Sequence, residues 1–450
     1  MYRKKDRKTM LFPEFKELLP FGGVLNEDNR WLKLAALIPW DELEDEYAKN
    51  FSENKGRPAK DARLIIGTML IARKKKTSDE ETRKDVQENP YMQAFCGLDS
   101  FNTKTLFDRS SLSKIRKRLG EEYFKKMEKA ILKILKKHKL INWRGVMVDA
   151  TVLPSAIRYP TDIWLLNEVR MWLEKHIKEA CRKLNIAKKT IRTYPRKAKI
   201  DYLNFAKKKR KGKKAIGKAR KKMLSYVKRN LGHMEMLLEE LKKCGHEIRK
   251  EFRDKHDTAV KIYSQQKEMQ EKGTHSVKDR IVSFCQPWVR PIVRGKAGNK
   301  VEFGTKVVLS NVDGYAFVDY IDSDNFNEAV KLWESIEAYE ERFGEKPQDI
   351  TADLIYGNRE NRRKLKREGI KSGFKPLGRK AQTEEGIKHR QWVKAKQKKR
   401  SSRMEGIIGH VKVHYGLDKI GYRTQEGERI WARMGLMAMN LDTALKRWRS

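Results

Sequence analysis

The stretch RGVMVDAT at residues 144–151 decides the fold class, because it is a short apolar run that ends at an acidic residue. Residues 146–148 predict a buried strand, and Asp149 marks its end. The stretch QDITADLIYG at residues 348–357 repeats this pattern, with a second strand that ends at Asp353. We therefore expect two aspartates at the ends of two strands that are far apart in the chain.

The segments around these strands complete an alternation of strands and helices. Residues 162–278 carry apolar side chains at helical spacing and almost no strand signals, which predicts a helical insertion. Residues 301–324 predict a β-hairpin, because Asp313-Gly314 is a type I′ turn signal. The proline-broken residues 281–295 predict an edge strand or an extended arm. The remaining expected elements are a helix at 327–342, a helix at 359–368, a short strand at 370–375, a basic loop at 379–403 and helices from 402 to the end.

Without the insertion, the order from residue 144 onward is β-β-β-α-β-α-β-α. This is the order of an RNase H-like core, so the predicted fold class is α/β, a mixed sheet flanked by helices. An all-helical segment precedes it. The predicted domains are a helical N-terminal DNA-binding or assembly domain (1–125), the first part of the core (140–161), a basic helical insertion (162–280), and the remainder of the core with the C-terminal helices (281–450).

Short helices are expected in the N-terminal segment. The first runs from Asp61 to Lys74 and is started by Pro58, since proline suits the first turn of a helix. The second is capped by Thr77 or Ser78 and ends near Asn89-Pro90. The third, Ser110 to Gly120, is capped by serine and stopped by glycine.

The charge of the chain favours a polyanionic partner. Among 450 residues there are 103 lysines and arginines against 60 acidic residues, a formal net charge of +43. Such a charge attracts nucleic acid, whose counterions are released on binding. A basic solvated surface is the alternative interpretation. The density of the run from Lys207 to Lys222 favours phosphate contact, and the candidate DNA-binding residues here and in the third N-terminal helix are Lys207, Lys208, Lys209, Arg210, Arg116 and Lys117.

Cysteine and histidine give little support to a zinc or disulfide protein. The four cysteines are scattered without a CxxC pair, which predicts reduced thiols in a cytosolic protein. His410 and His414 share a helical face but lack the glutamate of an HExxH motif, so surface or DNA-facing histidines are favoured over a zinc site. No apolar run is long enough to span a membrane, and no secretory signal is apparent, so no membrane partner is expected.

A third carboxylate completes the candidate catalytic set. Glu405 is expected on the first turn of a late helix, facing Asp149 and Asp353 on adjacent strands. Carboxylates suit Mg²⁺ or Mn²⁺, and two such ions can activate a nucleophile and stabilise a leaving oxygen in phosphodiester chemistry. Each residue also has a purely structural interpretation. Asp149 and Asp353 could be turn or cap residues, and Ser402 with Glu405 forms a capping-box pattern.

At these residues the chain resembles the DDE transposases of bacterial insertion sequences, in the broad group that includes the insertion-sequence-five type. The similar segments cover nearly the whole chain. They are VDATVLPSAIRYPTD (148–162), ADLIYGNRENRRKLKREGI (352–370) and RMEGIIGHVKVHYGLDKI (403–420), with GRP (56–58), ENPYMQAFCG (88–97) and SSLSKIRKRLG (110–120) in the N-terminal segment.

The resemblance implies roles for particular residues. Asp149, Asp353 and Glu405 fall on the family's catalytic, metal-binding positions. Lys412 matches a lysine that holds DNA near the scissile phosphate, and it lies seven residues after Glu405 on the same helical face. Arg403 matches the basic position just before the glutamate.

The sequence departs from the family pattern at two places. Leu354 stands where many relatives have a lysine after the second aspartate, so the role of that lysine is missing or passes to Arg359, Arg362 or Arg363. Ser401 stands four before the glutamate, where related groups have arginine, which weakens the assignment of Arg403 more than that of the carboxylates.

The implied activity is metal-dependent nicking at transposon ends and joining of the 3′-hydroxyl to target DNA. The implied partners are double-stranded DNA, as terminal inverted repeats and target, and a second copy of the chain on paired ends. The implied location is the cytoplasm of a bacterial cell, at the nucleoid. The alternatives are a nuclease with the same core that does not join ends, a non-catalytic DNA-binding relative, and a basic RNA-binding structural protein. Intact carboxylates argue against the last two.

Overall fold

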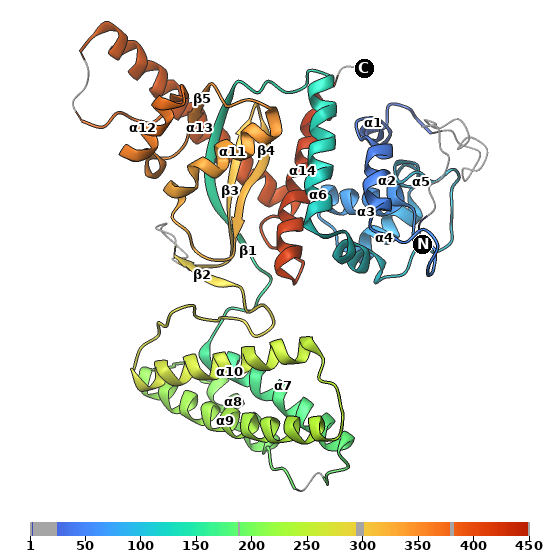
Figure 1. Cartoon of the computed structure of the whole chain (residues 1–450), viewed down its shortest axis with the longest axis vertical. Coiled ribbons are helices and arrows are strands. Elements are labelled where there is room, and N and C mark those ends of the chain that lie inside the picture. The colour runs from blue at the N-terminus through green and yellow to red at the C-terminus, as the bar shows by residue number, and fades with distance from the viewer. Residues whose placement is uncertain (1, 3–24, 188–189, 294–300, 379–381, 449–450) are drawn as a thin grey trace. The chain divides into compact units, whose positions relative to one another are not determined.

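A computed structural model gives the structure of the chain and describes residues 2, 25–187, 190–293, 301–378 and 382–448 (Figure 1). The chain divides into two compact units. The first joins Met1–Ala156 to Thr305–Ser450, and the second is Ile157–Gly304. The first unit holds a mixed sheet with helices, and the second is mainly helical. The predicted fold class, an RNase H-like core with a helical N-terminal segment and a helical insertion, is therefore confirmed.

The sheet has the strand order expected of this core. Its order is β2-β3-β1-β5-β6, and β4 pairs with β3 beside this path. β1 pairs with β5, and β5 with β6, in parallel, whereas β3 is antiparallel to both β2 and β4. The strands are β1 (Gly145–Pro154), β2 (Arg290–Val293), β3 (Val301–Val312), β4 (Tyr315–Asp322), β5 (Asp349–Thr351) and β6 (Lys371–Ser372).

The hairpin of β3 and β4 forms at the predicted turn. Asp313 and Gly314 have φ values of 51° and 90°. A type I′ turn needs positive φ at both central residues, and Asp-Gly tolerates this better than most dipeptides. β2 lies at one end of the strand order, as its prolines predicted. The local turn chemistry therefore sets the register of the hairpin.

The first unit surrounds its sheet with helices. Its helices are α1 (Arg30–Ala36), α2 (Trp40–Ala48), α3 (Ala62–Lys75), α4 (Asp79–Glu88), α5 (Pro90–Phe95), α6 (Ser111–Lys137), α11 (Leu332–Phe343), α12 (Arg359–Arg367), α13 (Glu384–Tyr415) and α14 (Gln425–Arg447), with the short 3₁₀ helices η3 (Glu328–Lys331) and η4 (Leu354–Tyr356). Among the described residues, no helix is long and apolar enough to cross a membrane.

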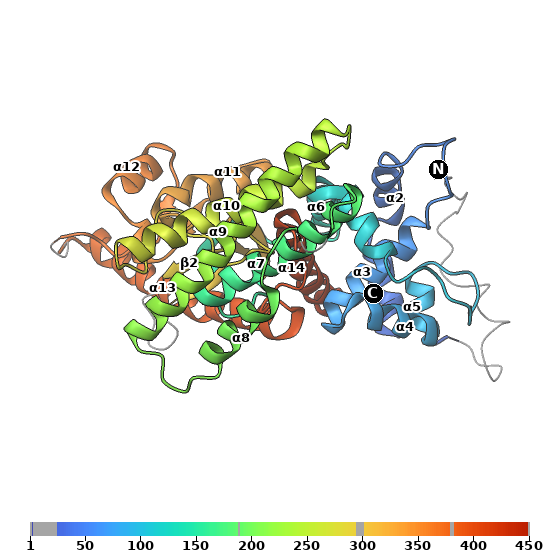
Figure 2. The same cartoon turned by 90° about the horizontal axis from the view of Figure 1, so that it is seen from below.

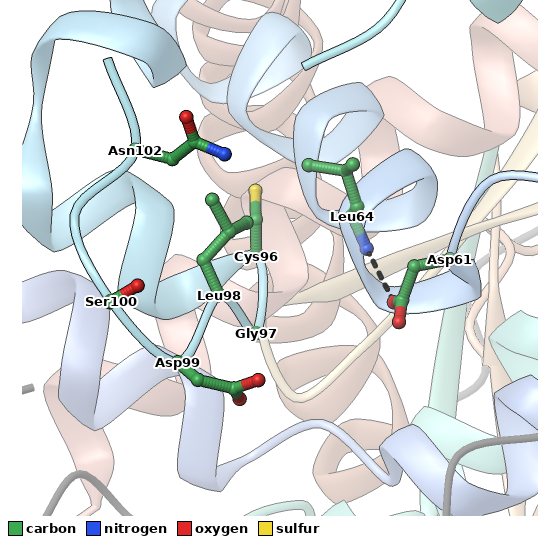
Figure 3. A pocket seen from close by; sticks show the side chains of 8 residues that line it. All are labelled: Asp61, Leu64, Cys96, Gly97, Leu98, Asp99, Ser100 and Asn102. Atoms are coloured by element: carbon green, nitrogen blue, oxygen red, sulfur yellow. Dashed lines mark hydrogen bonds between the residues drawn. The ribbon is translucent and has the colours of Figure 1, made fainter. Parts of the chain in front are cut away.

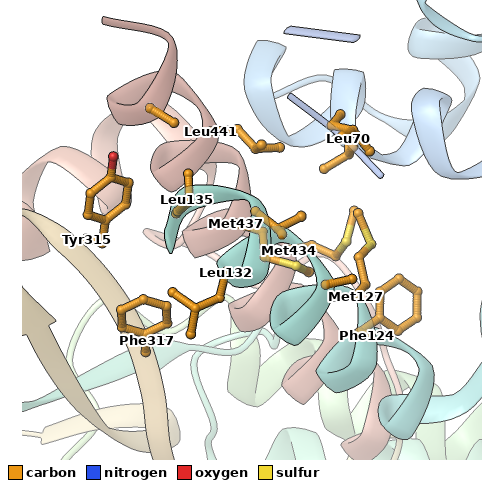
Figure 4. Packing of buried hydrophobic residues seen from close by; sticks show 14 of the residues in the cluster. Leu70, Phe124, Met127, Leu132, Leu135, Tyr315, Phe317, Met434, Met437 and Leu441 are labelled. Atoms are coloured by element: carbon orange, nitrogen blue, oxygen red, sulfur yellow. The ribbon is translucent and has the colours of Figure 1, made fainter. Parts of the chain in front are cut away.

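Helix α14 lies at the centre of the main hydrophobic core. Its residues from Gly427 to Leu441 are buried except for Arg429, and most of them are apolar, as expected of a helix enclosed by other elements. Figure 4 shows Met437 of α14 among side chains of α3, α6 and β4, such as Leu70, Leu132 and Phe317. The N-terminal helices and the sheet thus share one core. Whether residues 1–125 form a domain of their own remains a prediction.

Three predicted helix boundaries in the N-terminal segment can be compared with the structure. Ser78 is the N-cap of α4, as predicted, and accepts a hydrogen bond from the Glu81 amide at 3.2 Å. Pro58 does not start α3, because Asp61 caps that helix instead. Gly120 does interrupt the third helix, with φ of 67°, but the Ser110 side chain makes no capping bond, so that part of the prediction was wrong.

The second unit contains the predicted helical insertion. Figure 2 shows its helices α7 (Asp162–Lys183), α8 (Pro195–Ala206), α9 (Lys213–Lys243) and α10 (Lys250–Glu271) from below. They enclose a separate hydrophobic core that includes Leu166, Val227 and Leu237. The buried Asp162 carboxylate, which starts α7, pairs with Arg220 at 3.3 Å and Arg280 at 2.8 Å. The insertion is therefore stabilised by contacts of its own.

The basic loop predicted at 379–403 was wrong. Residues 379–381 lie outside the described residues, and from Glu384 onward the segment is part of the 32-residue helix α13, capped by Thr383. The apolar signal is sparse in this half of the helix, since Val393 and Met404 are its only buried side chains before Val411. The capping box at Ser402 was also wrong, because Glu405 lies in the interior of α13 rather than on its first turn.

Candidate active site

Asp149 lies on β1, and Asp353 follows the end of the neighbouring parallel strand β5. The pairing of β1 with β5 joins Gly145 to Asp349 and Met147 to Thr351. The same register continued by two residues puts Asp149 beside Asp353. β1 runs on to Pro154, so Asp149 is inside this strand and the prediction that it ends the strand was wrong. Asp353 follows the end of β5 by two residues.

A single guanidinium lies between the two carboxylates. Arg400 of α13 donates through Nη2 to Asp149 Oδ2 at 2.8 Å, and its Nη1 lies 3.7 Å from Asp353 Oδ1. Its buried Nε has no hydrogen-bond partner. The Arg400 guanidinium of α13 therefore places one positive charge between Asp149 of β1 and Asp353, which follows β5.

The two carboxylates differ in their surroundings. The Asp149 side chain is 18% exposed, whereas that of Asp353 is 56% exposed. Burial raises the pKa of Asp149, and the Arg400 charge opposes this effect. The nearby carboxylates of Asp353 and Glu328 raise the pKa of Asp149 further, since like charges disfavour its ionised form. Among the groups around Asp149, the Arg400 charge does most to lower the pKa of this carboxyl.

Helix α13 is held against this edge of the sheet by polar contacts. Lys396 Nζ lies 2.7 Å from both carboxylate oxygens of Asp349. Gln397 Nε2 donates to the carbonyl of Ala352 at 3.1 Å and to that of Gly373 at 2.6 Å. These bonds attach one turn of α13 to the ends of β5 and β6, and they place Arg400 over the aspartates on the next turn.

The structure does not bring Glu405 to the pair. Glu405 is exposed and lies five residues after Arg400 on the same helix. In an α-helix this offset turns the side chain about 140° around the axis and moves it about 7.5 Å along it. Within the described residues, no three His, Cys, Asp or Glu side chains gather in a group that could hold a metal. Glu405 as a ligand remains a prediction.

Most of the predicted DNA-binding residues lie at the surface. Arg403 is exposed and Lys412 is half-buried on α13, and Arg359 is exposed at the start of α12. Lys117 is exposed on α6, and residues 207–210 are exposed between α8 and α9.

Arg116 is the exception and is a correction. It is buried, its Nη2 lies 2.8 Å from Asp79 Oδ2, and its guanidinium lies 3.5 Å from the ring centre of Tyr422. A buried and paired guanidinium cannot reach a phosphate, so the sequence-based assignment of Arg116 to DNA binding was wrong.

Two comparisons identify the family of this chain. Residues 286–441 match a family model described as "Transposase DDE domain", and residues 21–118 match one described as "Transposase domain (DUF772)". A curated protein of Rhizobium meliloti, "Uncharacterized protein ORF8 in nfe locus", is 31% identical over 160 residues, which are 35% of this chain and 77% of that protein. The chain belongs to the DDE transposases. No solved structure matches this transposase.

The matched ranges can be compared with the positions of the site residues. The DDE range includes Asp353, Arg400 and Glu405, whereas Asp149 lies outside both matched ranges. The pairing of β1 with β5 is therefore what attaches Asp149 to the DDE region of this transposase. The carboxylate oxygens of Asp149 and Asp353 are the ligands that Mg²⁺ prefers, and the guanidinium between them shows that the pair accepts a cation.

Sequence reasoning missed Arg400 and Gln397. The signal was present, because Val393, Gln397, Arg400 and Met404 recur at intervals of three and four residues. This is the spacing of one helical face. It was overlooked because the density of lysine and arginine in 394–403 suggested a solvated loop.

A small pocket in the N-terminal helices of the transposase is a separate feature. It has a volume of about 220 Å³ and is lined by residues between α3 and the chain after α5. Figure 3 shows that the Asp61 carboxylate at its edge accepts a hydrogen bond from the Leu64 amide, at 3.2 Å. This carboxylate is the N-cap of α3, so it has a structural role in this pocket.

Proposed function

We propose that this transposase cuts DNA at the ends of its transposon and joins the free 3′ ends to target DNA, using Mg²⁺ or Mn²⁺ held by Asp149, Asp353 and Glu405. Two ions are expected. The observation that supports the proposal is that Asp149 of β1 and Asp353, which follows the adjacent strand β5, share one cationic side chain, Arg400. For Glu405 the support is its position in the family motif. To reach Asp149 and Asp353, either helix α13 would have to shift or the Glu405 side chain would have to change its conformation.

The chain contributes binding, orientation and charge to this chemistry. When bound, divalent ions supply an activated oxygen nucleophile and stabilise the leaving oxygen of a phosphodiester. Asp149, which is mostly buried, would hold its ligand oxygens in a fixed direction, and the exposed Asp353 would face the incoming DNA. Arg403, Lys412 and Arg359 lie at the surface of α13 and α12, where their charges can neutralise phosphates near the scissile bond.

The proposed partners follow from charge and family. A net charge of +43 favours double-stranded DNA, both as terminal inverted repeats and as target. The exposed residues Lys207, Lys208, Lys209 and Arg210 of the insertion, with Lys117 of α6, would hold DNA outside the catalytic centre. A homodimer on paired ends is proposed, acting at the nucleoid in the bacterial cytoplasm.

The test uses plasmid DNA that carries both ends of the element and a second plasmid as target. Wild type is expected to nick at the ends in Mg²⁺ or Mn²⁺ and to give joined products. Asp149→Asn and Asp353→Asn are each expected to lower cleavage by at least about a hundredfold, because one ligand of the metal centre is lost. Glu341→Gln is the matched control. It removes an exposed acid of α11 that pairs with Lys129, and it is expected to keep cleavage.

The outcomes separate the alternatives. Metal-dependent cleavage that survives Asp149→Asn contradicts the proposed site. Cleavage without joining, when supplied with pre-cut 3′ ends, favours the nuclease alternative. DNA binding without cleavage in wild type favours the non-catalytic relative.

A further inference from the structure

A basic pocket opens beside Asp353. Its volume is about 620 Å³, and α13 lines one side of it with Arg390, Lys394, Gln397, Lys398, Arg400 and Ser401. Counted from Arg390, the other five lie four, seven, eight, ten and eleven positions further along, which spans about 160° of the helix circumference, so they line one side of the helix. The opposite side is formed by Asp353 and Leu354 with the chain from Lys375 to Gly378.

Positive charge predominates among the side chains that line this pocket. Five basic side chains line it, from Lys375, Arg390, Lys394, Lys398 and Arg400, against the single carboxylate of Asp353. Lys394 and Lys398 are both exposed, and within the described part of the chain the structure records no acidic partner for either. Their charges are therefore available to a ligand, and its chemistry must be anionic.

The walls of the pocket are fixed rather than loose. The Arg362 guanidinium donates from Nε to the Gly357 carbonyl at 2.6 Å and from Nη2 to the Lys375 carbonyl at 2.6 Å. Gln397 attaches the facing helix to the ends of β5 and β6. The distance between the two walls is thus set by contacts that involve none of the free lysines, as expected of a site prepared before its ligand arrives.

The rim adds an apolar component. Leu354 and Leu377 are 58% and 60% exposed, and the neighbouring Ile355 is 51% exposed. Such large aliphatic side chains at the edge of a cationic pocket suit a ligand that carries apolar faces as well as charge. A DNA strand does so, since its sugars and bases alternate with its phosphates. Free inorganic phosphate would leave these leucines without a partner.

We propose that this pocket binds the sugar-phosphate backbone of the DNA strand next to the scissile phosphate, with Lys394 and Lys398 contacting consecutive phosphates and Leu354 contacting the sugar or base. The inference rests on the proposed function, because it places the backbone by reference to Asp353. It adds a subsite on the N-terminal half of α13, outside the motif around Glu405.

The first experiment maps which lysines DNA covers. Full-length protein in EDTA is acetylated at its lysines with and without a linear duplex of about four helical turns, and the modified positions are read by mass spectrometry. Lys394 and Lys398 are expected to be protected by the duplex. Lys399, which follows directly but lies on another face of α13, is the internal control and is expected to remain reactive.

The second experiment measures phosphate contacts through salt dependence. Lys394→Gln with Lys398→Gln is expected to lower the slope of log K against log salt by about 1.8, since each phosphate contact contributes about 0.9. The matched control, Lys388→Gln with Lys399→Gln, removes the same charge from other faces of the same helix and is expected to change the slope by less than about half as much. Exposed lysines are replaced in both, so folding is not at risk.

The outcomes distinguish this subsite from the function on which it rests. If DNA protects Lys207 to Lys209 but leaves Lys394 and Lys398 as reactive as Lys399, the subsite is overturned and DNA binding stands. If DNA protects no lysine at all, both fall. Asp149→Asn in EDTA is expected to keep the protection at Lys394 while losing cleavage in Mg²⁺, which would separate backbone binding from catalysis.

Discussion

Arg400 occupies the position of positive charge between Asp149 and Asp353. Two carboxylates this close repel each other, and the guanidinium relieves the repulsion. A divalent ion bound by the same oxygens would do the same and would have to displace the guanidinium. Arg400 also lines the basic pocket of about 620 Å³ beside Asp353.

The first prediction concerns this competition. Arg400→Gln is expected to bind Mn²⁺ about five- to tenfold more tightly, a gain of about 1 kcal/mol, because a competing cation is gone. Thermal melting across a Mn²⁺ titration measures the affinity. Without metal, the variant is expected to melt below wild type. Lys399→Gln, which removes an exposed positive charge from another face of α13, is the control and is expected to match wild type. Weaker Mn²⁺ binding by Arg400→Gln would show that Arg400 supports the ion instead.

A second residue-scale prediction concerns the buried Arg342. Its guanidinium lies 2.6 Å from Asp319 and 3.3 Å from Glu128, and all three side chains are nearly inaccessible. Burial raises the pKa of Asp319, against the opposing effect of Arg342.

Arg342→Ala is expected to lower the free energy of unfolding by about 3–5 kcal/mol, because it removes the counter-charge of the buried Asp319, whereas Glu128 keeps its ion pair with Arg433 at 3.4 Å. Urea unfolding midpoints provide the measurement. Lys129→Ala breaks the exposed pair with Glu341 and is expected to cost less than about 1 kcal/mol. Equal effects of the two substitutions would contradict this account.

At the scale of the element, α13 connects the two halves of the proposed site. Its N-terminal half carries the basic pocket and Arg400, and its C-terminal half carries Glu405 and Lys412. Arg400 and Glu405 lie on the same continuous helix. If a metal ion displaced Arg400 by shifting this helix, the shift would also move Glu405 relative to the two aspartates.

The continuity of α13 gives the third prediction. Thr383→Ala is expected to lower the free energy of unfolding by about 1 kcal/mol, since Thr383 accepts from the Gly386 amide as the N-cap. Ser402→Ala is expected to change it by less than about 0.5 kcal/mol, because alanine is a better helix former in a helix interior. Both are measured by urea unfolding. A larger cost at Ser402 would indicate that the helix begins there, as the capping-box pattern suggested.

At the scale of the whole molecule, the two units differ in how their cores are built. The core of the second unit draws only on residues 163–284. In the first unit, α14 from the C-terminal end of the chain packs on α3 and α6 from its N-terminal part. The core of the insertion is therefore built from one continuous segment, whereas the core of the first unit combines residues from the N-terminal and C-terminal parts of the chain.

The fourth prediction follows from this difference. A fragment of residues 157–289 is expected to be helical and to unfold in one cooperative thermal transition, followed by circular dichroism. Residues 1–125 alone are expected to lack a cooperative transition, because Leu70 would lose its partners on α14. Asp162→Asn, which leaves Arg220 and Arg280 without their buried carboxylate, is expected to lower the melting temperature of the 157–289 fragment. A non-cooperative melt of that fragment would contradict the existence of an independent core.

Much of the fold was predictable because its signals are local. The apolar run before Asp149, the Asp313-Gly314 turn and the helical spacing of the insertion each depend on residues close in sequence. The proximity of Asp149 and Asp353 was predictable because each follows a local apolar run, and because the first and fourth strands of this core are adjacent. The basic half of α13 was missed because charge density outweighed a sparse apolar stripe.

By itself, the sequence determined most of the elements, the hairpin turn, the adjacency of the first and fourth strands, and the family resemblance that selected Asp149, Asp353 and Glu405. Only the tertiary structure decided that Arg400 bridges the aspartates, that Arg116 is buried, that Glu405 stands apart from the pair, and that a basic pocket opens beside Asp353. The physical reason is distance along the chain. Asp149 and Arg400 are separated by 251 positions, and no local pattern encodes a contact that forms only when β1, β5 and α13 have packed together.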